Sequence, residues 1–217
     1  MKSRNLKLLF FTLLLAAFNS QALEVTVKDQ EGNVLSDAVV WFEGEKHQLK
    51  TNQAAEMYSM GQKDRTFTPH ILVVPQGAKV EFPNFDSILH HVYSFSKPKP
   101  FELKLYRDTP KSEITFENQG VVELGCNIHD WMLGYILVVN SGSYALTNNR
   151  GVAKIELDKV QLGKANLNVW HERFEKLDSS EQLTVVVDSV NQKMTYTIKQ
   201  PLMESFDFEA DEMDGYE

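Results

Sequence analysis

Short segments in which apolar and polar residues alternate recur along most of the chain, as in Glu24-Val25-Thr26-Val27-Lys28. Alternation with a period of two is typical of a β-strand with one buried face. The segments are rich in Val, Ile, Tyr and Phe, and Gly, Asn, Asp, Ser and Pro separate them. The pattern predicts thirteen strands: 24–28, 38–42, 71–74, 79–82, 91–95, 101–106, 113–116, 121–124, 135–139, 153–157, 167–170, 183–187 and 194–198. Many short strands with turns between them predict an all-β protein built from sandwiches.

Three segments depart from this pattern. Residues 48–66 are poor in apolar side chains, which predicts a loop or a single short helix. Residues 204–217 hold seven acidic side chains and no basic one, which is typical of a solvated, disordered tail. The first 22 residues carry Lys2, Arg4 and Lys7, then an apolar stretch, then Ser20-Gln21-Ala22. That order predicts a secretory signal peptide cut after Ala22, with an uncleaved anchor as the alternative.

Composition narrows the partners and the compartment. Without residues 1–22, the chain has 19 basic and 30 acidic side chains, a net charge of −11. This charge argues against nucleic acid as a partner. We expect a periplasmic protein with no membrane span after signal cleavage. An exported protein with a single cysteine, Cys126, has no intrachain disulfide partner for it, which favours a functional thiol.

The candidate chemistry lies at this cysteine and at a histidine pair. Cys126, His129 and Met132 follow one another at intervals of three residues, and His90-His91 precede them by about 36 residues. Soft sulfur donors favour Cu(I), imidazole suits both copper states, and a His₂Cys set with a weak axial Met is typical of electron-transfer copper. Zinc prefers four strong donors and rarely takes a thioether, so this set fits copper better.

Three sequence blocks extend the pattern: Phe82-Pro83-Asn84-Phe85-Asp86, His90 to Ser96 and Gly125 to Asp130. Through them the chain resembles the cupredoxins, the type 1 blue copper family, with the Cys-x-x-His-x-x-Met spacing of amicyanin. From Phe67 to Asn140 it also resembles plastocyanin-like periplasmic proteins labelled methylamine utilisation proteins. The resemblance implies a Greek-key sandwich with one copper ion held by His90, Cys126 and His129 and by a weak axial Met132. It also implies Trp131 and Leu133 as an apolar rim for a redox partner.

The choice between the two histidines stays open at the level of sequence. Cupredoxins commonly have Asn after the first ligand, where this chain has His91. Adjacent side chains on a strand point to opposite faces, so we expect only one of the two at the metal, and we favour His90. His70 and His171, with His91, are candidates for a second metal site. Asn84 and the backbone near His91 are candidates for hydrogen bonds to the Cys126 sulfur.

Two distant segments resemble parts of a second sandwich. Residues 25–43 and 144–170 are similar to the strands of a transthyretin-like domain, as in carboxypeptidase regulatory domains, although Asn148 stands where an Asp is expected. We therefore predict an accessory sandwich, made of residues 23–47 and 142–202, with the cupredoxin domain of residues 48–141 inserted into one of its loops. A signal peptide over 1–22 and an acidic tail over 203–217 complete this division.

Three functions compete. We favour a carrier of single electrons between periplasmic redox proteins over a catalyst. The second is a protein that binds and delivers copper, for which Met57 and Met60 are extra sulfur donors. The third is an enzyme with an open copper position, which an axial Met132 would fill. The lysines 97, 99 and 104 form a basic cluster suited to docking by charge. No Ser-His-Asp order, phosphate-binding Gly loop or CxxC motif is present.

Overall fold

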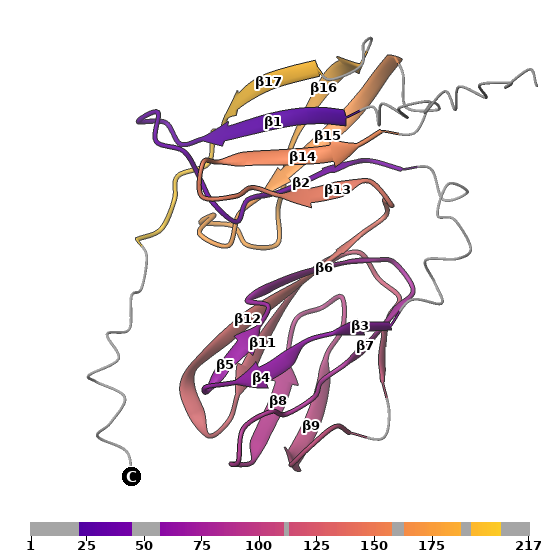
Figure 1. Ribbon diagram of the computed structural model, residues 1–217, viewed down its shortest axis with the longest axis vertical. Coiled ribbons are helices and arrows are strands. Elements are labelled where there is room, and N and C mark those ends of the chain that lie inside the picture. Colours follow the sequence, from indigo (N-terminus) through magenta and orange to yellow (C-terminus); the bar gives the residue numbers. More distant parts are fainter. Residues whose placement is uncertain (1–21, 45–56, 111–112, 158–162, 188–191, 205–217) are drawn as a thin grey trace, which may run out of the picture.

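The computed structural model describes residues 22–44, 57–110, 113–157, 163–187 and 192–204, and within them every regular element is a β-strand (Figure 1). The all-β prediction is therefore confirmed. None of the described residues belongs to a helix long and apolar enough to span a membrane. The signal peptide lies outside these residues, except that Ala22, its predicted last residue, begins the first strand. Nearly all of the acidic tail lies outside them too.

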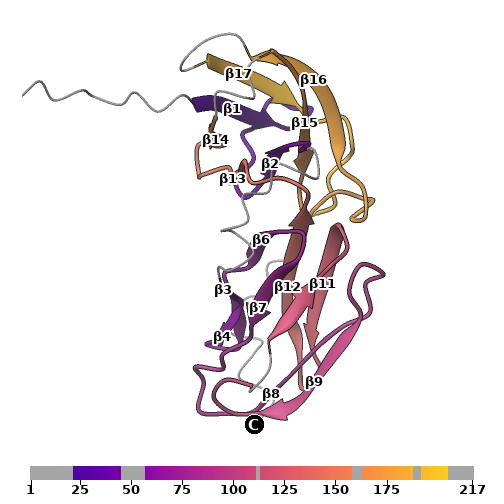
Figure 2. The same ribbon diagram turned by 90° about the vertical axis from the view of Figure 1, so that its right-hand side faces the viewer.

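The sheets fall into two groups stacked along the long axis of the molecule (Figures 1 and 2). We call the group drawn at the top of Figure 1 the upper group and the other the lower group. The upper group has a sheet of order β14-β1-β17, with β14 Val152–Glu156, β1 Ala22–Lys28 and β17 Gln192–Thr197. Its second sheet has the order β13-β2-β15-β16, with β13 Tyr144–Leu146, β2 Val39–Phe42, β15 Gly163–Trp170 and β16 Glu181–Val187.

The lower group contains the segment between β2 and β13. Its five-stranded sheet has the order β6-β12-β11-β8-β9, with β6 Ile71–Pro75, β12 His129–Val139, β11 Gly120–Cys126, β8 His90–Ser94 and β9 Phe101–Tyr106. A three-stranded sheet has the order β10-β7-β3, with β10 Ile114–Phe116, β7 Ala78–Glu81 and β3 Met57–Ser59. A hairpin joins β4 Gly61–Lys63 to β5 Thr66–Thr68.

These pairings bring the first and the last described strands together in the upper group. β1 pairs with β14 and β17, and β2 pairs with β13 and β15. Neither β1 nor β2 pairs with a described strand of residues 57–139. The predicted domain boundaries and the family of the second sandwich stay predictions.

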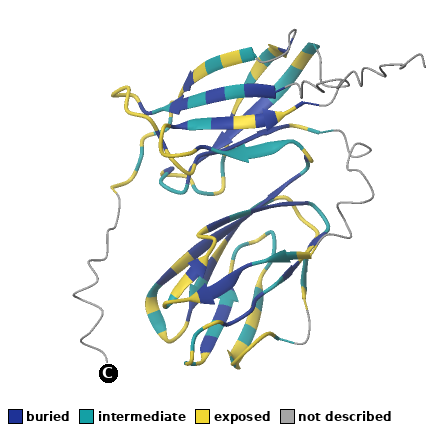
Figure 3. Cartoon of the chain, in the orientation of Figure 1, coloured by how far each residue is buried: buried dark blue, intermediate teal, exposed yellow. Residues whose placement is uncertain are grey.

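The apolar runs of β6 and β12 belong to two cores at once. On β12, Tyr135 and Leu137 pack into a core shared with the upper group, whereas Ile136 and Val138 pack into the core of the lower group. Strand alternation explains this division, because successive side chains leave the sheet on opposite faces. A strand covered on both faces is a nearly continuous apolar run, as the sequence shows here. β12 thus links the two groups, and both of its faces are largely buried beyond Gly134 (Figure 3).

Two sequence predictions need correction. Residues 48–66 were expected to be a loop or a single short helix, but the described part of that segment, 57–66, forms β3, β4 and the first residue of β5. The segment has few apolar residues because each strand is three residues long, and Met60 and Phe67 supply the buried contacts. The strand expected at 135–139 starts at His129, so only Asn127 and Ile128 separate β11 from β12.

Candidate metal centre

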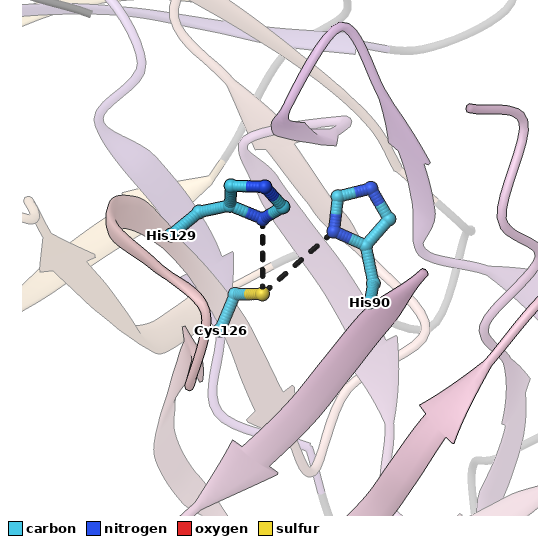
Figure 4. Close-up of side chains that lie close together, drawn as sticks. All are labelled: His90, Cys126 and His129. Carbon is cyan, nitrogen blue, oxygen red and sulfur yellow. Dashed lines mark hydrogen bonds between the residues drawn. The ribbon is translucent and has the colours of Figure 1, made fainter. Parts of the chain in front are cut away.

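His90, Cys126 and His129 come together at the end of the lower group that lies away from the upper group (Figures 1 and 4). Their side-chain donor atoms all lie within 4.8 Å of one another. Cys126 Sγ is 3.7 Å from His90 Nδ1 and 3.4 Å from His129 Nδ1. In the described part of the chain, this cluster of His90, Cys126 and His129 is the only group of three or more His, Cys, Asp or Glu residues with metal-binding spacing.

The hairpin between β11 and β12 positions two of these residues. Cys126 ends β11, His129 begins β12, and the two are paired across the two-residue turn. The pairing register shifts here, because Gly125 pairs with Leu133 whereas Cys126 pairs with His129. Irregularities of this kind re-aim side chains and are common beside functional sites. The third residue, His90, begins β8, and β8 pairs with β11 next to the site.

A backbone hydrogen bond ties the two ligand segments together. The N–H of Asn127 donates to the carbonyl of His91, with an N···O distance of 3.1 Å. This contact fixes the turn of the β11–β12 hairpin against β8 without help from the His91 side chain. The His91 ring lies apart from the cluster, because its Nε2 is 2.9 Å from a Glu102 carboxylate oxygen on β9. The structure thus brings His90, and not His91, to the cysteine.

Burial leaves the cluster shielded from solvent except at His129. His90 is 0% exposed and Cys126 is 3% exposed, whereas His129 is half-buried. Burial lowers the pKa of His129, and the charges of His90 and Arg65 add to that effect. A lowered pKa keeps the ring neutral near pH 7, which is the form that binds a metal.

An unpredicted residue, Asp86, holds His90 from the other side. Its Oδ2 lies 2.8 Å from His90 Nε2, so that Nδ1 of the same ring is free to face Cys126. Burial alone would raise the pKa of Asp86, but hydrogen bonds from Arg65, His90 and Asp64 lower it on balance. Metal-bound histidines usually donate their second N–H to such a carboxylate. An acid four residues before the histidine, within a turn, was the signal available in the sequence.

Asn84 has a different role from the one expected. Its amide nitrogen donates to the carbonyls of Ile88 and Tyr106, at 2.8 and 3.2 Å, and its Oδ1 accepts the N–H of Asp86 at 2.9 Å. Both amide hydrogens are therefore used, one within the loop before β8 and one at the end of β9. Asn84 shapes the loop that carries Asp86, and it is not the donor to the Cys126 sulfur that we predicted.

Met132 and Trp131 lie on β12 beyond His129. Met132 is 2% exposed and belongs to the same core cluster as Cys126. The Trp131 ring is 5.6 Å from the His129 ring, and Leu133 is 41% exposed. Both Cys126 and Met132 border an open cleft of about 990 Å³, which Leu177 of the upper group also lines.

The predicted second metal site does not form in the described part of the chain. Glu172 binds His70, Ser36 binds His171 through its carbonyl, and Glu102 binds His91. The predicted basic cluster is also partly neutralised, because Lys99 is 3.0 Å from a Glu117 carboxylate oxygen.

The donor set fits a single soft metal ion. A metal about 2.0 Å from an imidazole nitrogen and about 2.3 Å from a thiolate, at a tetrahedral or trigonal angle, separates the two donors by roughly 3.5–3.8 Å. The two sulfur–nitrogen distances here, 3.7 and 3.4 Å, lie close to that range. The site needs little rearrangement to accept an ion.

Comparisons with known proteins add the following. No protein-family model and no curated protein matches the chain. Among solved structures, the copper-containing nitrite reductase of Thermus scotoductus SA-01 matches with 26% identity and a TM-score of 0.37, over 40% of this chain and 23% of that one. The purple cupredoxin of Nitrosopumilus maritimus matches with 24% identity and a TM-score of 0.33, over 38% and 97%. An amicyanin variant in its reduced Cu(I) form matches with 19% identity and a TM-score of 0.34, over 46% and 97%.

The chain thus spans about a quarter of the length of the nitrite reductase. Because the TM-scores are low, we base the proposals below on the geometry of the site.

Proposed function

We propose that this chain is a copper protein that carries single electrons, with the ion held by His90, Cys126 and His129. The observation that supports it is the buried Cys126 sulfur with two imidazole nitrogens at 3.4 and 3.7 Å, already assembled by β8 and the β11–β12 hairpin. Copper bound there would supply a one-electron couple between Cu(I) and Cu(II). Met132 is the proposed weak axial ligand.

The chain's own residues suit this role. Electron transfer is fast when the ligands hold the same positions in both oxidation states, and rigid elements give that constancy. Here all three donors lie at strand ends within one hydrogen-bonded sheet. The His90 and Cys126 side chains exclude water, whereas the half-buried ring of His129 gives an electron a short route to the surface.

The surface around His129 suits a transient partner. Ile128 is 46% exposed and Leu133 is 41% exposed, and the half-buried Trp131 lies between them in sequence. These apolar side chains form the proposed contact for a redox protein in the periplasm. Export through the N-terminal signal belongs to the same proposal. The narrower resemblance to methylamine utilisation proteins rests on the sequence blocks alone and stays a prediction.

A spectrum of the copper-loaded, oxidised protein tests the proposal. We expect an intense visible charge-transfer band and a narrow copper hyperfine splitting in EPR, both lost in Cys126→Ser. The same preparation loaded with Zn(II) is the colourless control. An ordinary tetragonal copper spectrum that is unchanged in Cys126→Ser would refute a thiolate copper site.

Copper delivery is the second candidate, and the cleft of about 990 Å³ beside Cys126 and Met132 favours it. The cleft lies on the sulfur side of the site, so an exchanging ion would have to pass only the side chains that leave Cys126 and Met132 3% and 2% exposed. Transfer of copper to a chelator within seconds would support delivery. Retention of the ion over many oxidation and reduction cycles would support electron transfer.

A further inference from the structure

Asp86 connects the candidate metal centre to a strained turn on the surface. Its carboxylate accepts three hydrogen bonds: His90 Nε2 at 2.8 Å, the N–H of Asp64 at 2.7 Å and the N–H of Arg65 at 3.0 Å. The Asp86 side chain is 12% exposed, so little water competes for these contacts. Oδ2 is shared, because it accepts from both His90 and Arg65.

The turn in question joins β4 to β5 through two residues, between the paired Lys63 and Thr66. Asp64 has a φ of 53° and Arg65 a φ of 57°, so two consecutive side-chain-bearing residues adopt the left-handed conformation. Two-residue hairpin turns of this kind normally use Asn-Gly or Asp-Gly, since Gly carries no steric cost there. Such backbone persists only where its surroundings hold it, and Asp86 accepts both of its N–H groups.

The same turn places the positive charge of Arg65 near His129 of the candidate metal centre. Arg65 is half-buried, and its guanidinium is close enough to lower the pKa of His129. Lys63, Asp64 and Thr66 around it are exposed. The turn is therefore the part of the molecule through which an outside contact would reach the Asp86 carboxylate.

We propose that Asp86 is a positioning residue that couples the conformation of the β4–β5 turn to the electronic state of the metal, an inference that rests on the proposed copper site. While the turn is closed, Asp86 orients the His90 ring and, as an anion, makes it a stronger donor, which favours Cu(II). When the turn opens, the N–H groups of Asp64 and Arg65 move away and the Asp86 carboxylate moves with them. Its hydrogen bond to His90 then weakens, and the equilibrium between Cu(II) and Cu(I) shifts toward Cu(I).

Two variants at one exposed position test the coupling while leaving Asp86 in place. Asp64→Gly suits the left-handed turn, Asp64→Val disfavours it, and both remove the same charge. We expect Asp64→Gly to keep the wild-type reduction potential. We expect Asp64→Val to shift the equilibrium toward Cu(I) by about threefold, roughly 28 mV for a one-electron couple at 59 mV per tenfold. Equal potentials for the two variants would overturn the proposal.

A double-mutant cycle is completed by measuring Asp86→Asn alone and in combination with each Asp64 variant. We expect the single Asp86→Asn change to favour Cu(I) by about tenfold, or 59 mV. In its background, Asp64→Val and Asp64→Gly should have the same potential, and a difference that persists there would contradict the coupling. Asp29→Asn is the matched control, because Asp29 accepts hydrogen bonds from Asn33 in a turn of the upper group.

A readout without metal separates this inference from the proposed function. In the metal-free protein, Asp86→Asn should speed amide hydrogen exchange at Asp64 and Arg65 by at least tenfold, and Asp29→Asn should not. Unchanged exchange would refute the link between Asp86 and the turn, whatever the metal. Faster exchange in Asp86→Asn, together with a wild-type protein that lacks the thiolate–copper band, would refute the copper site alone.

Discussion

His90 and His91 are neighbours in sequence that face different environments. His90 is fully buried beside Cys126, whereas the His91 ring binds Glu102 at the surface of β9. Strand alternation produces this separation, since adjacent side chains leave β8 on opposite faces. His90 is therefore placed to bind the proposed copper ion, whereas His91 links β8 to the neighbouring strand β9.

A pair of substitutions measures the difference. His90→Gln should abolish the thiolate–copper band and reduce copper bound per chain to near zero. His91→Gln should keep both, because a partly exposed ion pair contributes about 1 kcal/mol or less to stability. Visible absorbance and metal content at equal protein concentration provide the check. Copper retained in His90→Gln but lost in His91→Gln would reverse the assignment.

The residues that form the cluster could be predicted, whereas the only sequence signal for Asp86, which orients His90, was its position four residues before that histidine. Cys126 and His129 are close in sequence, and the donor chemistry of the set indicated a metal without any structure. Asp86 reaches His90 through a loop whose shape depends on Asn84 and on contacts with residues 64 and 65. Such contacts between distant segments leave no periodic pattern in the sequence.

At the scale of elements, the side chain of Thr147, next to β13, hydrogen-bonds the loop between β1 and β2 in the upper group. Thr147 directly follows β13 and is 2% exposed. Its hydroxyl accepts the N–H of Ala38 at 2.9 Å and donates to the carbonyl of Leu35 at 2.6 Å. The loop between β1 and β2 thus has two backbone groups satisfied by one side chain.

Replacing this threonine should be costly for its size. Thr147→Val keeps the shape but leaves a buried N–H and a buried carbonyl without that partner, and each such group costs about 1–3 kcal/mol. We expect the free energy of unfolding to fall by about 2 kcal/mol or more in denaturant titration. Thr147→Ser, which keeps the hydroxyl, is the matched control. A loss in Thr147→Ser as large as in Thr147→Val would mean that the methyl group, not the hydrogen bonds, matters.

Long alternating segments were predicted well at this scale, and short strands were missed. β1 and β16 follow the expected ranges within two residues, and each of these strands is seven residues long. β3, β4 and β5 have three residues each, too few for a period to appear, and their pairing partners fix them. The early start of β12 at His129 has a related cause. Residues 129–134 show no strand pattern in the sequence, but the two-residue turn before them places them in a hairpin with β11.

At the scale of the whole molecule, an ion pair joins the two groups of sheets. His70 precedes β6 in the lower group, and its Nε2 binds a carboxylate oxygen of Glu172, which follows β15 in the upper group. The His70 ring also packs edge-on against Tyr135, which contacts Trp170 in the same way. The shared core and this pair hold the groups together.

Stability should therefore depend on pH through His70 and Glu172. The hydrogen bond to Glu172 raises the pKa of His70 above 6.5, while burial opposes it. Burial would raise the pKa of Glu172, but the bond to His70 lowers it below 4.5. The pair thus contributes fully between about pH 4.5 and 6.5. Its contribution is lost as the pH rises through the raised pKa of His70, or falls through the lowered pKa of Glu172.

Thermal unfolding at several pH values checks this expectation. His70→Gln should lower Tm most near pH 5.5 and least near pH 9, by an amount equivalent to at most about 1 kcal/mol because His70 is half exposed. Glu172→Gln should act in the same way, and the double variant should be little worse than either one. A Tm difference that is constant from pH 5 to pH 9 would show that the pair has no such role.

The return of the chain to the upper group beside its point of departure has a mechanical consequence. The N–H of Phe42 donates to the carbonyl of Ser143 at 3.2 Å, so the chain leaves and re-enters this sheet at neighbouring points, and the described strands between them, β3 to β12, lie outside it. Tension applied between Ala22 and Glu204 would pass through β1 and β17, which are parallel neighbours and would be loaded in shear. The strands that carry His90, Cys126 and His129 lie off this line of force. A protein tethered by its two ends would therefore keep its ligand geometry under loads that strain its upper sheets.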